Sequence, residues 1–325
     1  MTLTLGLYLP TWPPKGAAPR RWTEIRALAR RAETAGVDTL WVADEPGFWE
    51  LWTILTATAE ATDRIRVGSL VACTRYRNPA FLATMVRALD EVSDGRLVLG
   101  LGAGAGPTDP RLAAFGFDTG TGHVGRFAEA AEILVRLLRE GPVSVEGRFH
   151  RVAEPDIGPA GPRPAGPQIW MAAGRPRTME IAARWADAVN GADGLTDVAS
   201  VAALREGADR ACAVVGRDPG SLGLTGWARL AISADGRRDA DRSDTISGTP
   251  QAVAERLAGL ASAGLAHLAC FVGDPTDDHL FPALTDAALD GFQAVIEGLV
   301  AMTTEAGQAD AGSGAATAAK AAIDG

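Results

Sequence analysis

The stretch Leu97–Gly106, "LVLGLGAGAG", runs from strand-forming residues into glycines at positions 100, 102, 104 and 106. Glycine is unusual inside a strand, because it has no side chain to pack and loses more conformational entropy on ordering than any other residue. A bare backbone at a strand end lets a flat or phosphorylated ligand approach and accept hydrogen bonds from main-chain amides. For any single glycine a tight turn with positive φ is the simpler explanation. For the run as a whole, we favour the ligand.

The same stretch completes the fourth strand-and-helix repeat of the first hundred residues. Helices are predicted over 20–36, 49–61 and 78–95, where apolar residues recur at helical spacing. The intervening apolar runs predict strands over 3–9, 38–44, 64–73 and 96–102. These runs are nearly continuous, which indicates strands buried on both faces of a parallel sheet.

The pattern continues to the C-terminus. After a helix over 124–141 comes a Pro/Gly-rich segment, 141–167, which we expect to be an irregular insertion with a small hairpin around 143–152. Four further strands and their helices complete the series, with strands at 168–174, 187–191, 222–233 and 266–273 and helices at 177–186, 197–216, 248–264 and about 280–302.

Eight strands, each followed by a helix, predict an α/β fold, a (β/α)8 TIM barrel. The domain spans residues 1–303 with an irregular insertion after the fourth strand, and the low-complexity segment 304–325 is expected to be a flexible tail. An open doubly wound sheet is the alternative. The count of eight strands and the chain length favour the barrel.

Composition excludes several classes of function. The formal net charge is −9 and no basic cluster occurs, which argues against a nucleic-acid partner and for a small-molecule substrate. No apolar stretch is long enough for a membrane span, and the N-terminus lacks the features of a signal peptide. The cysteines form no C-x-x-C and the histidines no H-x-x-x-H, so we expect no metal site and a cytoplasmic location.

In a barrel the ligand binds at the C-terminal ends of the strands. Asp44 and Glu45 follow the second strand; being adjacent on an extended chain, they are expected to point in opposite directions, so that only one faces the barrel mouth. That carboxylate is a candidate proton donor or acceptor. The alternative is that one caps the next helix while the other is solvated.

A second candidate site lies in "AAGRPRTMEIAA" (172–183). Gly174, Arg175 and Arg177 precede a predicted helix, with Thr178 as a candidate cap. Free amides, the helix dipole and guanidinium groups together favour a phosphate site, and solvated loop arginines are the alternative. Aromatic residues near the strand ends are candidate walls for a planar ligand, although such residues are more often core or interface: Tyr8, Trp12, Trp41, Phe48, Trp49, Trp52, Tyr76 and Trp170.

Together these motifs resemble the luciferase-like monooxygenase superfamily, the flavin- and deazaflavin-dependent barrel oxidoreductases. The resemblance covers residues 3–300 and is carried chiefly by "AGVDTLWVAD" (35–44), "RNPAFLATMVRALDEVSDGRLVLGLGAG" (77–104) and "GPQIWMAAGRPRTMEIAARWADAVN" (166–190). It implies a flavin or deazaflavin in the barrel mouth and a cis non-prolyl bulge near Ser69 and Leu70. By resemblance, the cofactor-binding residues are Ser69, Leu70, Ala72, Thr74, Gly102, Gly104, Gly106, Ala173, Gly174, Arg175, Arg177 and Thr178.

The cofactor determines the reaction. With coenzyme F420, a 5-deazaflavin, the chain would transfer a hydride to or from a small organic substrate; with reduced FMN it would be a monooxygenase served by a partner flavin reductase. The segment "ACTRYRNPA" (72–80) favours the F420 branch. The substrate is expected to contact three loops, 10–19, 105–122 and 235–247, whose composition does not identify it.

One departure from the family pattern concerns catalysis. Some deazaflavin-dependent members have Asp-His after the second strand, where this chain has Asp44-Glu45. Glu45 is then a candidate acid in place of the histidine, and a non-catalytic flavin-binding barrel is a further alternative. Family members are often dimers, and the apolar helices predicted over 49–61 and 78–95 are compatible with a homodimer.

Overall fold

The computed structural model describes residues 3–12, 18–104, 110–117, 122–163, 165–236, 242–273, 282–302 and 304. Its strands are β1 (Thr4–Tyr8), β2 (Thr39–Val42), β3 (Arg66–Cys73), β4 (Leu97–Gly102), β5 (Ser144–Glu146), β6 (Arg151–Ala153), β7 (Gln168–Ala173), β8 (Ala188–Gly191), β9 (Gly223–Ile232), β10 (Thr245–Gly248) and β11 (His267–Gly273).

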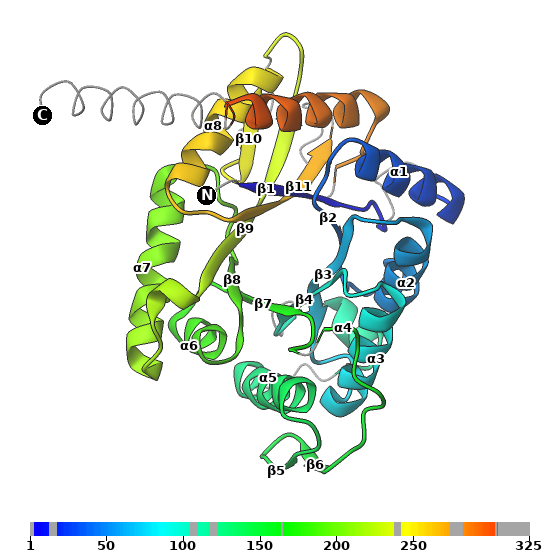
Figure 1. Cartoon of the computed structure of the whole chain (residues 1–325), viewed down its shortest axis with the longest axis vertical. Coiled ribbons are helices and arrows are strands. Elements are labelled where there is room, and N and C mark those ends of the chain that lie inside the picture. Colours follow the sequence, from blue (N-terminus) through cyan, green and yellow to red (C-terminus); the bar gives the residue numbers. More distant parts are fainter. Residues whose placement is uncertain are drawn as a thin grey trace, which may run out of the picture.

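Eight parallel strands close into a barrel in the order β1-β2-β3-β4-β7-β8-β9-β11. Closure comes from the parallel pairing of β11 with β1, and β8 pairs with β9 to complete the wall. Figure 1 shows this ring of strands surrounded by helices. The (β/α)8 barrel is therefore confirmed. The alternative of an open sheet is wrong, because the pairings of β11 with β1 and of β8 with β9 close the ring of eight strands.

The helices are α1 (Trp22–Thr34), α2 (Leu51–Ala61), α3 (Pro79–Val92), α4 (Pro110–Ala114), α5 (His123–Arg139), α6 (Pro176–Trp185), α7 (Val198–Val215) and α8 (Pro250–Ser262), and residues 286–302 are also helical. The N-terminus of α3 shows why a helix begins where it does: the Asn78 side chain accepts from the amides of Ala80 and Phe81, and Pro79 lies in the first turn. Within the described ranges, no helix is both long and apolar enough to cross a bilayer.

Two apolar cores share the strands. The larger lies between the barrel wall and the helices, while the smaller contains Tyr8, Trp41, Leu70, Trp170 and Phe271. Successive residues of a strand point to opposite faces, which is why neighbouring positions such as 41 and 42 belong to different cores. The rings of Trp41 and Trp170 lie 5.0 Å apart, so aromatic side chains fill the barrel interior.

A buried histidine completes this interior. Trp41 Nε1 donates to His267 Nε2 at 3.1 Å, so the ring proton lies on Nδ1, which is 2.8 Å from Thr4 Oγ1. Burial lowers the pKa of His267 to about 3, so the ring is neutral at physiological pH. Its role is therefore structural.

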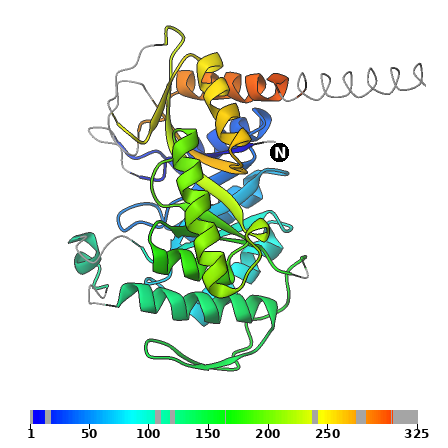
Figure 2. The ribbon, with the colours of Figure 1, turned by 90° about the vertical axis from the view of Figure 1, so that its left-hand side faces the viewer.

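Two segments depart from the plain repeat. The insertion after α5 carries the expected hairpin, β5 paired antiparallel with β6, which projects from the barrel beside α5 in Figures 1 and 2. The prediction of a loop over 235–247 is partly wrong, because Thr245–Gly248 form β10, which pairs with the second half of β9. The sequence of β10, "TISG", is too short to show a strand pattern. Its strand conformation comes with the parallel pairing to β9.

Two glycines of β4, Gly100 and Gly102, lie against a bulge in the neighbouring strand β3. The register of β3 against β4 shifts between Ser69 and Ala72, and the Leu70–Val71 peptide within this bulge is cis, one bond beyond the expected position. A Cβ on Gly100 would lie 2.1 Å from the Ser69 carbonyl oxygen, and one on Gly102 would lie 2.4 Å from Val71 Cγ2. The β3 bulge is thus a sufficient reason for both glycines.

This packing makes Gly100 the most constrained of the series, because the atom opposing it belongs to the backbone. We expect Gly100→Ala to lower the free energy of unfolding by about 3 kcal/mol, at the upper end of overpacking costs. Gly259→Ala, in α8 with its nearest outside atom 3.8 Å away, is the matched control and should raise stability by about 0.5–1 kcal/mol. Denaturant unfolding of both variants decides; a Gly100→Ala protein as stable as the wild type would contradict the packing argument.

Candidate functional site

A cavity of about 250 Å³ opens at the C-terminal ends of the strands. We call it the mouth cavity; its walls come from β1, β3, β7, β8, β9 and β11 and from the segment after β2. Apolar and aromatic side chains predominate, with two carboxylates and one amide among the lining residues: Tyr8, Ala43, Asp44, Glu45, Leu70, Val71, Ala172, Asn190, Gly191, Ala192, Trp227 and Phe271. Such a composition is typical of a site for a small, mostly apolar molecule.

Tyr8 connects two walls of this cavity. Its hydroxyl donates to the Leu70 carbonyl oxygen at 3.0 Å, and its ring stacks on Phe271 with centroids 3.8 Å apart and planes within 7°. Burial raises the pKa of Tyr8, so the phenol keeps its proton and stays a donor. The bulge of β3 is thereby held from across the barrel, with Leu70 and Val71 facing the cavity.

Asp44 is fixed by an ion pair. Its carboxylate accepts from Arg77 Nη1 at 2.5 Å and from the Cys73 amide at 3.0 Å, and Arg77 also reaches Glu50 at 2.8 Å. Burial raises the pKa of Asp44, while Arg77 and the Cys73 amide oppose that rise. Because its oxygens serve these contacts, Asp44 braces β2, β3 and the start of α2.

Glu45 is the more accessible carboxylate, with 26% of its side chain exposed against 8% for Asp44. Its Oε2 lies 2.9 Å from Arg111 Nη2 of α4. Both residues line the mouth cavity, and strand alternation does not decide which of the two carboxylates faces it. Strand geometry ends at Val42, and the alternation of side chains does not extend to residues 44 and 45.

The predicted cofactor residues of β3 and β4 divide between the cavity and the sheet. Leu70 lines the mouth cavity. Ser69 Oγ donates to the Gly100 carbonyl at 2.9 Å and accepts from the Gly100 amide at 3.1 Å, and Thr74 Oγ1 donates to the Gly102 carbonyl at 3.3 Å. Ala72 packs in the core beneath the helices. These contacts give each residue a structural role.

The remaining glycines of the opening stretch fall at the edge of the described chain. Gly104 has a φ of +81°, and a Cβ there would lie 2.4 Å from Cys73 Sγ, so a turn and a close neighbour both favour glycine. Gly106 lies outside the described residues. A role for Gly102, Gly104 or Gly106 in cofactor binding stays a prediction.

The predicted phosphate residues around the start of α6 are not all brought together. Gly174 and Arg175 line a groove between α6 and α7, whereas Arg177 lines a separate crevice with Glu129, Glu132 and Glu180 between α5 and α6. Arg175 holds the N-cap position of α6, and Thr178 takes part in the cap from the third position of the helix, where its hydroxyl accepts from the Arg175 amide at 3.2 Å. Ala173 packs in the outer core.

Gly174 nevertheless adjoins the mouth. A Cβ at this position would lie 2.8 Å from the Cβ of Ala192, a lining residue of the mouth cavity. Gly174 therefore lies against the cavity wall, whereas Arg177 is not among the residues that line the cavity.

The sequence prediction missed several residues of the cavity lining: Ala43, Val71, Ala172, Gly191, Ala192, Trp227 and Phe271. For β7 a signal existed: Trp170 faces the barrel interior, and by strand alternation so does Ala172, not the predicted Ala173. Asn190 was noted at a strand end but not selected. It is buried, and its Oδ1 accepts from Thr225 Oγ1 at 3.1 Å.

Metal and thiol chemistry receive no support from the described part of the chain. No group of three or more His, Cys, Asp or Glu side chains is placed there to hold a metal ion. Cys73, Cys212 and Cys270 are buried and unpaired, and burial raises the pKa of Cys73 to about 11, so this thiol near the mouth is protonated at neutral pH.

Comparison with known proteins adds a family and relatives. The sequence model described as luciferase-like monooxygenase matches residues 4–243. A 5,10-methylenetetrahydromethanopterin reductase of Archaeoglobus fulgidus is 25% identical over 243 residues, 73% of this chain and 70% of that protein. An F420-dependent glucose-6-phosphate dehydrogenase of Amycolatopsis mediterranei is 26% identical over 173 residues, 50% of this chain and 51% of that protein.

Solved structures agree on the fold. The coenzyme F420 dependent tetrahydromethanopterin reductase of Methanopyrus kandleri superposes with a TM-score of 0.75 at 18% identity, covering 92% of this chain and 100% of that chain. A monooxygenase from Streptomyces bottropensis gives a TM-score of 0.76 at 20% identity, covering 93% and 100%. At these identities the likeness establishes a shared barrel.

Removing Arg77 tests whether this cation stabilises the buried carboxylate of Asp44. Arg77→Met leaves a buried carboxylate without its cation, and we expect a loss of about 3–5 kcal/mol of stability at pH 8. The folded-state pKa of Asp44 then rises further above its unfolded value. A carboxyl with a raised pKa binds its proton more tightly in the folded state, so the deficit should shrink as pH falls through that pKa.

Denaturant unfolding at pH 8 and pH 5 measures this deficit. Arg136→Met is the control, because Arg136 forms exposed pairs with Glu132 and Glu140 and its loss should change little at either pH. An Arg77→Met deficit that stays constant or grows toward pH 5 would contradict the assignment.

Proposed function

The chain belongs to the luciferase-like monooxygenase family, and from this premise we propose that it is an oxidoreductase transferring a hydride between F420 and a small organic substrate. The mouth cavity carries the proposal. Its lining is mostly apolar or aromatic and includes one partly exposed acidic residue, Glu45. The relative from Amycolatopsis mediterranei is named for F420, which supports F420 over FMN.

The residues present fit a planar ring. At about 250 Å³ the cavity is below the roughly 300–1,000 Å³ of sites that enclose a whole drug-sized ligand, so it would take the ring of a larger cofactor and leave the rest outside. Leu70 and Val71 of the bulge and the aromatic side chains of Tyr8 and Trp227 would hold the ring. The backbone of Gly174, beside Ala192, would meet the phosphate.

When bound, a 5-deazaflavin supplies two-electron hydride chemistry. Reduction of a carbonyl or imine by hydride leaves a heteroatom that requires a proton, and oxidation of an alcohol or amine requires that a proton be removed. Glu45 is the carboxylate we assign to this transfer, because it lines the cavity and is partly exposed. Arg111 fixes its carboxylate at the rim, and Asp44 positions the backbone through Arg77 and Cys73.

Two further expectations accompany this proposal. We infer a cytoplasmic enzyme, and a homodimer formed through α2 and α3, where Trp49 and Phe81 are exposed beside and on these helices. A reductase partner belongs only to the FMN alternative.

Filling the mouth cavity should remove cofactor binding. Ala172→Phe places a ring where the proposed cofactor ring lies, and we expect the Kd for F420 to rise at least a hundredfold, because the cavity has no room for both. Ala27→Phe, on an exposed face of α1, is the matched control and should leave the Kd unchanged. Fluorescence titration gives both values, and thermal unfolding checks the fold. Unaltered F420 binding by a folded Ala172→Phe protein would place the cofactor elsewhere.

Glu45→Gln tests the proton-transfer role. With reduced F420 and a panel of ketones and imines, consumption of the cofactor followed by absorbance identifies a substrate. On that substrate we expect kcat to fall by about 10²–10⁴-fold in Glu45→Gln, the usual contribution of a positioned acid or base, while the Kd for F420 changes less than twofold. Glu91→Gln, exposed on α3, should keep full activity. Equal kcat values in Glu45→Gln and wild type would eliminate Glu45 as the proton carrier.

A further inference from the structure

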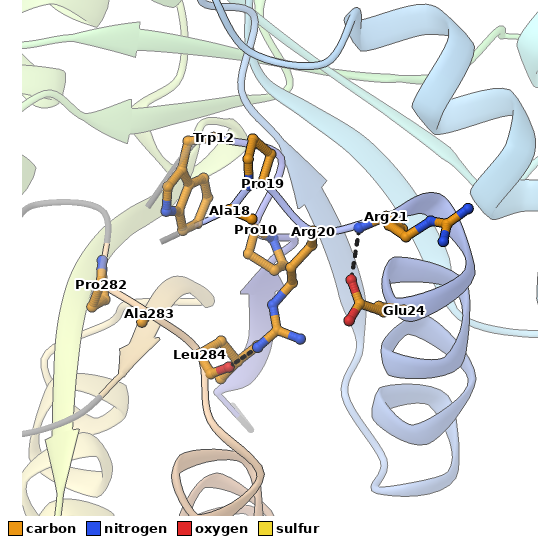
Figure 3. Close-up of a pocket in the computed structure, with 10 residues that line it drawn as sticks. All are labelled: Pro10, Trp12, Ala18, Pro19, Arg20, Arg21, Glu24, Pro282, Ala283 and Leu284. Atoms are coloured by element: carbon orange, nitrogen blue, oxygen red, sulfur yellow. Dashed lines mark hydrogen bonds between the residues drawn. The ribbon is translucent and has the colours of Figure 1, made fainter. Parts of the chain in front are cut away.

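A second cavity, of about 450 Å³, lies beside the barrel mouth. It is bounded by the segment that follows β1, by the start of α1 and by residues 282–284, which precede the last helix (Figure 3). None of its lining residues lines the mouth cavity. Two aromatic rings lie between the cavities: Trp12 lines the second cavity and Phe271 lines the mouth cavity, and their ring centroids are 5.9 Å apart.

The uncharged residues that line this second cavity are apolar. Pro10, Pro19 and Pro282 line it together with the buried indole of Trp12 and the side chain of Leu284. Proline rings have fixed backbone torsions and an indole packed in a core has few conformations, so little freedom remains to be lost when a ligand binds. Such walls suit a flat apolar body.

One cation reaches into these walls. Figure 3 shows the Arg20 side chain extending between Pro10 and Leu284, and one Nη donates to the Leu284 carbonyl oxygen. A guanidinium carries five N–H donors. Among the described residues no carboxylate lies within ion-pair distance of Arg20, so its charge is uncompensated by the chain described.

The lining also contains two other charged residues, Glu24 and Arg21. The Glu24 carboxylate accepts from the Arg21 amide at 2.7 Å and lies in the first turn of α1, where the helix dipole favours a negative charge. The Arg21 guanidinium points away from the cavity in Figure 3. Arg20 is therefore the cation that a ligand in this cavity would meet.

From this combination we propose that the second cavity is a binding site for a planar apolar organic anion, an aryl carboxylate being the simplest case. The carboxylate pairs with the free N–H groups of Arg20, and the ring lies among Trp12 and the three prolines. A guanidinium and a carboxylate form charge-assisted hydrogen bonds that a neutral amide cannot match. The site is separate from the mouth cavity and does not depend on which cofactor the mouth binds.

Isothermal titration of the full-length chain with 2-naphthoate, 2-naphthamide and 2-naphthylmethylammonium tests the site. We expect naphthoate to bind at least tenfold more tightly than the neutral amide, and the ammonium compound not to bind. Arg20→Met should weaken naphthoate binding by about 10- to 100-fold and leave the amide unchanged, whereas Arg20→Lys should recover part of the loss. Arg26→Met, exposed on α1, is the matched control.

Two outcomes would overturn the proposal. One is equal affinity for naphthoate and its amide, which would mean that the charge of Arg20 is not used. The other is naphthoate binding that is unchanged in folded Arg20→Met protein but lost in Ala172→Phe, which would place the anion in the mouth cavity. Thermal unfolding of each variant confirms that it is folded before titration.

Discussion

The bulge in β3, where the backbone leaves the register of β4 between Ser69 and Ala72, is the constraint on which the site depends. Ser69 Oγ both donates to and accepts from the backbone of Gly100, which replaces the ladder hydrogen bonds that the bulge interrupts. Tyr8 holds the Leu70 carbonyl from across the barrel. The result is a short stretch of strand, Leu70–Val71, that faces the mouth cavity instead of continuing the wall.

Charge is arranged around that stretch in two separate pairs. The buried pair, Asp44 with Arg77, ties the end of β2 to the end of β3 and uses the oxygens of Asp44 for structure. The partly exposed pair, Glu45 with Arg111, places a carboxylate at the rim and connects it to α4. A structural and a chemical role are thus divided between two adjacent acids, and burial decides which acid has which role.

Much of this fold could be predicted from sequence. Apolar runs alternate with helical periodicity eight times, and eight such repeats favour a closed barrel over an open sheet. The site could be predicted only in part. Both faces of each strand are buried, so hydrophobicity does not show which residues face inward, and Ala173 was chosen where Ala172 lines the cavity. The glycines of β4 looked like a ligand signal. The Ser69 backbone and the Val71 side chain of β3 are a second reason for Gly100 and Gly102, and this close approach is a long-range contact which no local pattern reveals.

The central claim is that the mouth cavity binds a deazaflavin ring, and parallel titration of the purified chain with F420 and FMN, each oxidised and reduced, tests it most directly. Binding is followed by the fluorescence and absorbance of the cofactor. The account predicts that F420 binds at least tenfold more tightly than FMN in the same redox state. A preference for reduced FMN would instead indicate an oxygen-using monooxygenase, and failure of both cofactors to bind would contradict the assignment of this cavity.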